Sequence, residues 1–118
     1  MKTEHGHVLL DALVMTGDQV SKWKVVNNRT HLGFHVKTAG GTTRNGVLKF
    51  IPTNDFSITD PTDVDALAVP QLIIAAGTAY NQVIEIPDFC AGGIAAWYDH
   101  GLNGAAGETI TVTIVEKQ

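Results

Sequence analysis

The chain has 118 residues, of which 44% are hydrophobic and 17% charged, a composition typical of a compact globular protein and not of a disordered one. The formal net charge of −4 argues against a protein that holds nucleic acid, because phosphate neutralisation requires a basic surface. The single cysteine, Cys90, excludes an intrachain disulfide framework and a cysteine-based zinc site. Because Cys90 follows Phe89 in an apolar run, we expect it to be buried and unreactive.

Apolar and polar residues alternate with a period of two along most of the chain, and this period predicts β-strands. In chain order, the predicted strands are residues 8–15, 21–25, 32–38, 46–51, 72–75, 82–86, 93–98 and 109–114. In the second of these strands, Trp23 and Val25 are expected to face the core and the two lysines the solvent. The longest stretch without a strand signal is residues 55–70, where residues 63–67 are compatible with one helical turn or with a loop that crosses between sheets.

About eight short strands separated by turn signals predict an all-β fold, an antiparallel β-sandwich of the jelly-roll type. Residues 1–118 are predicted to form one domain, with residues 1–7 as a flexible N-terminal arm. The N-terminus is a poor match to a signal peptide, and no apolar stretch reaches the length of a membrane span, so no membrane partner is expected.

The histidines nearest the N-terminus are the first candidates for chemistry. His5 and His7, followed by Asp11 and Gly17, partly resemble the first metal-binding motif of cupins, in which imidazoles and a carboxylate hold a metal. The aspartate stands where that family has glutamate, and residues 100–103 are a poor match to its second motif. We favour a terminal tail over a metal site, and we expect neither a metal nor another cofactor.

Two further groups have the donor atoms of metal sites but lack other features that such sites require. His31 and His35 fall on one face of a predicted strand roughly 13 Å apart, too far to share a metal, so we expect them at the surface or in an interface. Asp60, Asp63 and Asp65 have calcium-like spacing, but the loop lacks the turn glycine and terminal glutamate of an EF-hand. A solvated acidic loop is the favoured interpretation.

The sequence patterns of common catalytic sites are not found. Neither Ser21 nor Ser57 lies in a Gly-x-Ser-x-Gly elbow, and no glycine pair is followed by the Lys-Ser/Thr of a phosphate loop. Spacing leaves open a carboxylate pair as in glycosidases, but most of the four glutamates lie near ends or turns: Glu4, Glu85, Glu108 and Glu116. We therefore expect a non-enzymatic protein without catalytic or cofactor-binding residues.

Aromatic residues suggest a possible sugar-binding surface. Trp23, Tyr80, Trp97 and Tyr98 are candidates for a stacking platform on one face of the sandwich. However, Trp97 and Tyr98 are adjacent, so they point to opposite faces of a strand and at least one of them is expected in the core. Core packing is favoured over a carbohydrate platform.

From Phe34 to the C-terminus the chain resembles small β-sandwich structural proteins of tailed bacteriophages. The resemblance is carried by three segments: Phe34-His35-Val36-Lys37-Thr38, then Gly46-Val47-Leu48-Lys49-Phe50-Ile51-Pro52-Thr53-Asn54-Asp55, and Ala95-Ala96-Trp97-Tyr98 before a Gly-rich loop and an alternating last strand. The chain departs from that pattern at residues 94–96, where an arginine is usual.

The resemblance implies a virion component, best matched in size by a capsid cement or decoration protein. Its expected partners are the major capsid protein and further copies of itself, as a homodimer or homotrimer, with no nucleic acid and no membrane. Such a protein is made in the cytoplasm of the bacterial host and ends on the capsid surface. The alternatives are a tail- or fibre-associated structural module and a carbohydrate-binding β-sandwich module.

Overall fold

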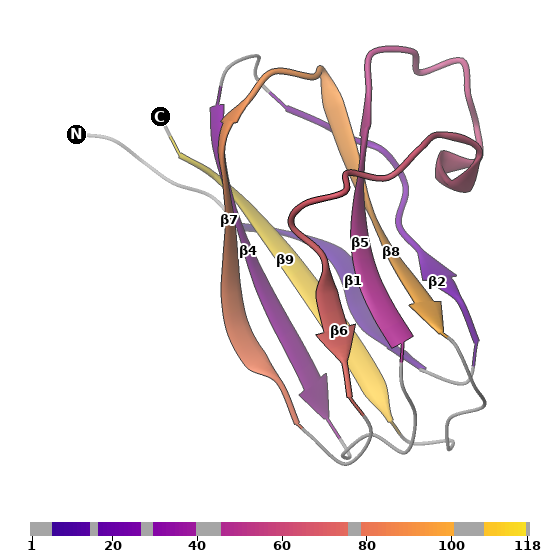
Figure 1. Cartoon of the computed structure of the whole chain (residues 1–118), viewed down its shortest axis with the longest axis vertical. Helices are drawn as coiled ribbons and strands as arrows, with labels where there is room; N and C mark the ends of the chain where they lie inside the picture. The colour runs from indigo at the N-terminus through magenta and orange to yellow at the C-terminus, as the bar shows by residue number, and fades with distance from the viewer. Residues whose placement is uncertain are drawn as a thin grey trace.

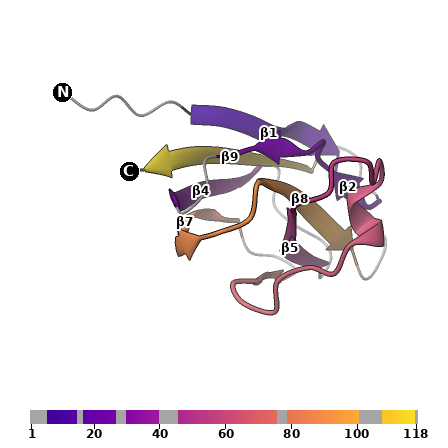
Figure 2. The same cartoon turned by 90° about the horizontal axis from the view of Figure 1, so that it is seen from above.

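The computed structural model describes residues 6–14, 17–26, 30–39, 46–75, 79–100 and 108–117, and nine strands lie within these ranges. They form two antiparallel sheets that pack face to face (Figures 1 and 2). In chain order the strands are β1 (Gly6–Val14), β2 (Gln19–Val20), β3 (Lys24–Val25), β4 (Thr30–Ala39), β5 (Gly46–Thr53), β6 (Leu72–Ile74), β7 (Asn81–Phe89), β8 (Gly93–His100) and β9 (Thr109–Lys117).

The strand order identifies the jelly-roll topology. Sheet A has the order β1–β9–β4–β7, and sheet B has the order β2–β8–β5–β6, with β3 also paired to β8. If β2 and β3 are counted as one interrupted edge strand, eight strands remain, as in a jelly roll of two packed sheets. The predicted all-β, jelly-roll-like sandwich is therefore confirmed.

The core lies between the sheets and consists of the side chains that alternate inward along each strand. At its centre the rings of Phe34 on β4 and Phe50 on β5 pack 4.2 Å apart, centroid to centroid, at an angle of 35°. Tyr98 is the largest of the fully buried side chains. Its neighbour Trp97 points the other way and is partly exposed, which confirms that at least one of the two belongs to the core.

The strand expected over residues 21–25 is wrong in its extent and, at Lys24 and Val25, in its orientation. Ser21 is buried between β2 and β3, where its hydroxyl accepts a hydrogen bond from the Ala96 amide (2.9 Å) and donates one to the Lys22 carbonyl (3.0 Å). This interruption changes the phase of the alternation. Val25, expected inside, is therefore 64% exposed, and Lys24 lies opposite the buried Ile94.

The N-terminal strand begins earlier than the sequence indicates. Gly6 and His7, which the sequence assigns to a flexible arm, belong to β1 and pair with Val115 and Ile114. The rest of that arm, residues 1–5, lies outside the described residues, as does Met15 at the end of the predicted first strand.

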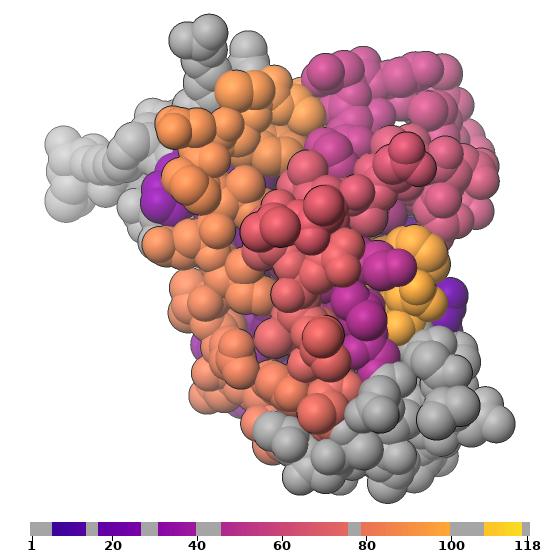
Figure 3. All heavy atoms as spheres, in the orientation of Figure 1, coloured from indigo at the N-terminus to yellow at the C-terminus, as the bar shows by residue number. Residues whose placement is uncertain are grey.

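The segment between β5 and β6 does not cross between the sheets, because both strands belong to sheet B. It contains one 3₁₀ turn, η1 (Pro61–Asp63), and it folds back so that the Leu67 amide donates to the Phe50 carbonyl (2.8 Å). Figure 3 shows residues 54–70 spread over one face of the molecule. Ile51 and Ala95 on sheet B are not part of the core between the sheets, yet they are fully buried. Their burial is expected if this segment covers them.

Candidate functional site

Five side chains on three neighbouring strands of sheet B form a surface that we call the Trp97 patch: Val47, Lys49, Ile73, Trp97 and Asp99. The register brings them together, because Val47 lies opposite both Ile73 and Asp99, and Lys49 lies opposite Trp97. Along β5 and β8 they alternate with the fully buried Leu48 and Tyr98, so they project from the outer face of the sheet.

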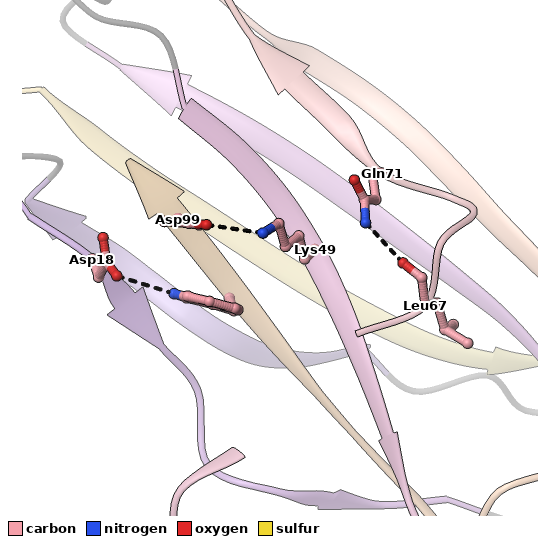
Figure 4. A network of polar contacts seen from close by, with 6 residues as sticks. Asp18, Lys49, Leu67, Gln71 and Asp99 are labelled. Atoms are coloured by element: carbon pink, nitrogen blue, oxygen red, sulfur yellow. Dashed lines mark hydrogen bonds and ion pairs between the residues drawn. The ribbon is translucent and has the colours of Figure 1, made fainter. Parts of the chain in front are cut away.

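Polar contacts hold the aromatic side chain of the patch in place. The Lys49 ammonium lies 4.7 Å from the centroid of the Trp97 ring and 2.9 Å from Oδ2 of Asp99 (Figure 4). The Trp97 indole Nε1 is 3.4 Å from Oδ2 of Asp18, at the margin of the patch. An ammonium group over an aromatic ring is attracted to it, and here the same group is also paired with a carboxylate. The orientation of Trp97 is thus fixed by two charged neighbours.

The patch combines the apolar contact area of Val47, Ile73 and Trp97 with the Lys49–Asp99 ion pair. Ile73 is 68% exposed and stands beside Val47, next to the Lys49–Trp97 pair. Protein interfaces are typically enriched in Trp and have an apolar centre with a polar rim. The arrangement is therefore suited to binding a protein surface.

Part of the phage resemblance lies at the end of β5, in Thr53-Asn54-Asp55. These residues stabilise the fold through local hydrogen bonds. The Asn54 side chain accepts a hydrogen bond from the Gly92 amide (2.7 Å), and the Thr53 hydroxyl accepts one from the Asp55 amide (2.9 Å). Asp55 in turn accepts hydrogen bonds from Ser57, which lower the pKa of its carboxyl group. This motif ties the β5–β6 segment to the β7–β8 turn.

The acidic loop is exposed, as expected, and one of its carboxylates serves the 3₁₀ turn. Asp60 caps η1 by accepting hydrogen bonds from the amide and hydroxyl of Thr62 (3.0 and 2.8 Å), and these bonds lower the pKa of its carboxyl group. Asp63 and Asp65 are exposed on the same segment.

Two surface hollows are lined by none of the five patch residues. One, of about 440 Å³, is lined by Pro52, Thr53, Asn54, Asp55, Ile58, Val64 and Ala91. The other, of about 300 Å³, is lined by His7, Val8, Leu9, Val20, Ser21, Lys22 and Trp23. The carboxylate of the first hollow is already bonded to Ser57, so its lining offers mainly apolar contact.

The four candidate aromatic residues do not form one platform. Tyr98 is in the core, and Trp97 is on the outer face of sheet B. Trp23 packs edge-on against Phe56 and donates from Nε1 to the Ile58 carbonyl (2.7 Å). The Tyr80 hydroxyl bonds to the backbone at β6, donating to the Ile73 carbonyl (3.0 Å). Each ring therefore has its own structural neighbours.

The structure places two of the cupin-like residues on β1. His7 and Asp11 are exposed on this strand, and His5 lies outside the described residues. Within the ranges that the structure describes, no three His, Cys, Asp or Glu side chains are close enough to share a metal. In the same ranges, no helix is both long and apolar enough to cross a bilayer.

His31 and His35 lie on the outer face of sheet A, as the alternation predicts. His31 Nε2 is 3.6 Å from Oε1 of Glu85, and the His35 ring is hydrogen-bonded to the Asn81 side chain. The other two described glutamates lie elsewhere. Glu116 takes the register position opposite Leu32, and Glu108 is buried just before β9.

The expectation that Cys90 is buried is wrong. Cys90 is exposed, and its Sγ donates to the Asp88 carbonyl (3.2 Å). The inward position at the end of β7 is taken by Phe89, and the positive φ of Asp88 (54°) turns the chain there. Cys90 therefore points outward although Phe89 before it is buried and Ala91 after it packs against the core.

Comparison with solved structures finds the same fold in another protein. No protein-family model matches the chain, and no curated protein matches its sequence. Seven solved chains match in structure. One is the SPBc2 prophage-derived protein YomS, with a TM-score of 0.52 and 14% sequence identity, covering 99% of this chain and 97% of that chain. The two chains thus share their fold over nearly their whole lengths.

Sequence reasoning did not find the Trp97 patch as a unit. The period of two puts Trp97 and Tyr98 on opposite faces of their strand without deciding which faces outward, and the contact between Lys49 and Trp97 depends on the register between β5 and β8. These strands are separated by about forty residues of chain, and no local pattern specifies such a pairing.

Proposed function

We propose that this protein is a non-enzymatic structural component of a bacteriophage virion, a cement or decoration protein that binds the major capsid protein and stabilises the head. In this proposal the protein is made in the host cytoplasm and acts on the capsid surface, together with further copies of itself. The supporting observation is the fold that it shares, end to end, with a prophage-derived protein. The phage-like segments of the sequence support it independently.

The Trp97 patch is the surface that we propose for contact with the capsid. A cement protein has to bind an already folded protein surface, and it does so through exposed side chains on a rigid body. Four of its five side chains lie on two long paired strands, β5 and β8, and the fifth, Ile73, lies on the neighbouring β6; the Trp97 ring is in contact with Lys49. A surface fixed in advance loses little side-chain freedom on binding, which favours affinity.

The test uses phage particles that lack the protein. We expect such particles to release their DNA at a lower temperature, or after milder osmotic shock, than complete particles, and purified protein to restore their stability. Unchanged stability of the deficient particles would overturn the cement role.

Two matched variants test the surface. Ile73→Lys puts a charge into the patch at a side chain that is 68% exposed, and Val25→Lys makes the same change at a side chain that is 64% exposed, on β3 outside the patch. We expect Val25→Lys to restore particle stability and Ile73→Lys not to restore it. Both variants should unfold at the same temperature as the native protein. Equal restoration would show that the patch is not the contact.

The same material separates the alternatives. Electron microscopy of particles with labelled protein distinguishes a head location from a tail or fibre location. A glycan array tests the carbohydrate-binding alternative, for which binding has to disappear on substitution of Trp97 or Trp23.

A further inference from the structure

The sandwich has four edges, and three of them are poorly suited to pairing with another strand. β2 and β3 have two residues each, and β6 has three. The backbone at β6 is also bonded by a side chain, because the Tyr80 hydroxyl donates to the Ile73 carbonyl and accepts from the Ala75 amide (3.0 and 2.9 Å). Short strands and occupied backbone groups are common protection against edge-to-edge association.

The edge at β1 is interrupted in a different way. Its register with β9 is irregular between Val8 and Leu10 and again between Leu10 and Leu13. Within this stretch Ala12 has a positive φ of 47°, and its amide is bonded to the Thr111 hydroxyl (3.0 Å). Such irregularities bend a strand and interrupt the straight row of backbone groups that a further strand needs.

Over most of its length, the edge at β7 is neither short nor irregular in register. It is nine residues long, it lies at the side of the molecule in Figure 1, and among the described strands it pairs only with β4. From Asn81 to Ile86 its register with β4 is regular, and only its far end carries Pro87 and the positive φ of Asp88. Val83 in the middle of the regular part is 65% exposed.

We propose that β7 pairs with β7 of a second copy of this chain, antiparallel and about a two-fold axis through Val83, so that sheet A continues across a homodimer. An interface between two identical surfaces is the commonest arrangement of soluble dimers. This inference goes beyond the proposed function, and its test needs only the purified protein.

The side chains of β7 favour this axis over the axes at Ile84 and Glu85. Side chains opposite each other in an antiparallel pair lie on the same face, so the two-fold axis has to pass through a residue. With the axis at Val83, the two valines are opposite each other, and Glu85 is opposite Asn81 of the second copy. An axis at Ile84 would set Glu85 against Val83, and one at Glu85 would set two carboxylates together, which is unfavourable.

Sedimentation equilibrium of the full chain at increasing concentration tests the dimer. We expect the native protein to approach twice the mass of one chain, Val83→Lys to remain at the mass of one chain, and Val25→Lys to behave as the native protein. Val83→Lys sets two ammonium groups opposite each other at the axis, whereas Val25 has nearly the same exposure on another edge. A native protein that stays monomeric at every concentration, or a dimeric Val83→Lys, would overturn the proposal.

Disulfide trapping tests the register and does not depend on how Val83→Lys folds. Because Cys90 is exposed and could itself form disulfides, each variant also carries Cys90→Ser. Opposite residues of an antiparallel pair have Cα atoms about 4.5–5.5 Å apart, within the range of a disulfide. Val83→Cys should therefore form a disulfide-linked dimer on mild oxidation, whereas Glu85→Cys alone should not. A mixture of Glu85→Cys and Asn81→Cys should form a disulfide-linked heterodimer. Linking of Val83→Cys no faster than that of Val25→Cys would refute the two-fold axis.

Discussion

Two glycines of sheet B offer a test of how burial decides the cost of a methyl group. A Cβ atom built on Gly46 would lie 2.6 Å from Cε1 and Oη of Tyr98, and one built on Gly93 would lie 2.5 Å from Cε1 of Phe56. The overlaps are nearly equal, but the rings are not equally free to move. Tyr98 is fully buried, whereas Phe56 is 45% exposed.

For Gly46→Ala, the Tyr98 ring has to push other core side chains aside, and overpacking of this kind costs roughly 1–3 kcal/mol. For Gly93→Ala, the Phe56 ring can turn into solvent, so the main loss is its edge contact with Trp23, about 1 kcal/mol or less. The approach of the new Cβ to the Lys24 carbonyl (3.3 Å) adds a small strain. The loss of chain freedom in the unfolded state favours both variants and cancels in their comparison.

Urea unfolding at equilibrium measures the two free energies, with a shift of the midpoint at constant slope as the sign of a change in stability. Tyr98→Leu in the Gly46→Ala background is the control, since leucine lacks the ring atoms that the methyl group meets. We expect the double variant to be less destabilised than the sum of the single changes. Equal costs for Gly46→Ala and Gly93→Ala, or strict additivity with Tyr98→Leu, would refute this reasoning.

Further predictions concern the bonds that shape the edges and the long loop. Ser21→Ala leaves the buried Ala96 amide without its acceptor and should lower the free energy of unfolding by about 1–3 kcal/mol, measured by urea unfolding. Tyr80→Phe should speed hydrogen exchange of the Ala75 amide, because the hydrogen bond from this amide to the Tyr80 hydroxyl is removed. The pKa of Asp60 is lowered in the folded protein, so its contribution to stability is complete above the unfolded pKa of about 3.9 and is lost as the pH falls through the folded pKa. An acid unfolding curve unchanged by Asp60→Asn would contradict this assignment.

The positions of most strands could be predicted because local alternation reflects burial directly. Ile110, Val112 and Ile114 are buried, and the threonines between them are on the outer face, as the period of two indicates. The same rule fails at residues 21–25, where the Ser21 side chain takes part in the backbone bonding of β8. A single polar side chain in a backbone role is enough to change which residues face the core.

Features that depend on pairing between distant strands were not accessible from the sequence. The alternation could not show that Lys49 is opposite Trp97, or that β7 is an edge while β4 lies between two neighbours. It also could not show that the four aromatic candidates lie in different parts of the molecule, with Tyr98 in the core and Trp97 on the outer face of sheet B. These outcomes are decided by register and strand order, which local patterns leave undetermined.

The two proposed surfaces belong to different sheets, so one can be occupied without covering the other. A dimer formed along β7 carries two Trp97 patches, and binding by both at once to a repeating capsid surface can raise the apparent affinity by roughly 10²–10⁴-fold over a single contact. Val83→Lys should therefore weaken binding to whole particles while leaving binding to an isolated capsid subunit unchanged, whereas Ile73→Lys should weaken both. Surface plasmon resonance with each target immobilised at low density measures the difference. If Val83→Lys weakens binding to the isolated subunit as well, β7 is itself part of the capsid contact, and the division of tasks between the two sheets is wrong.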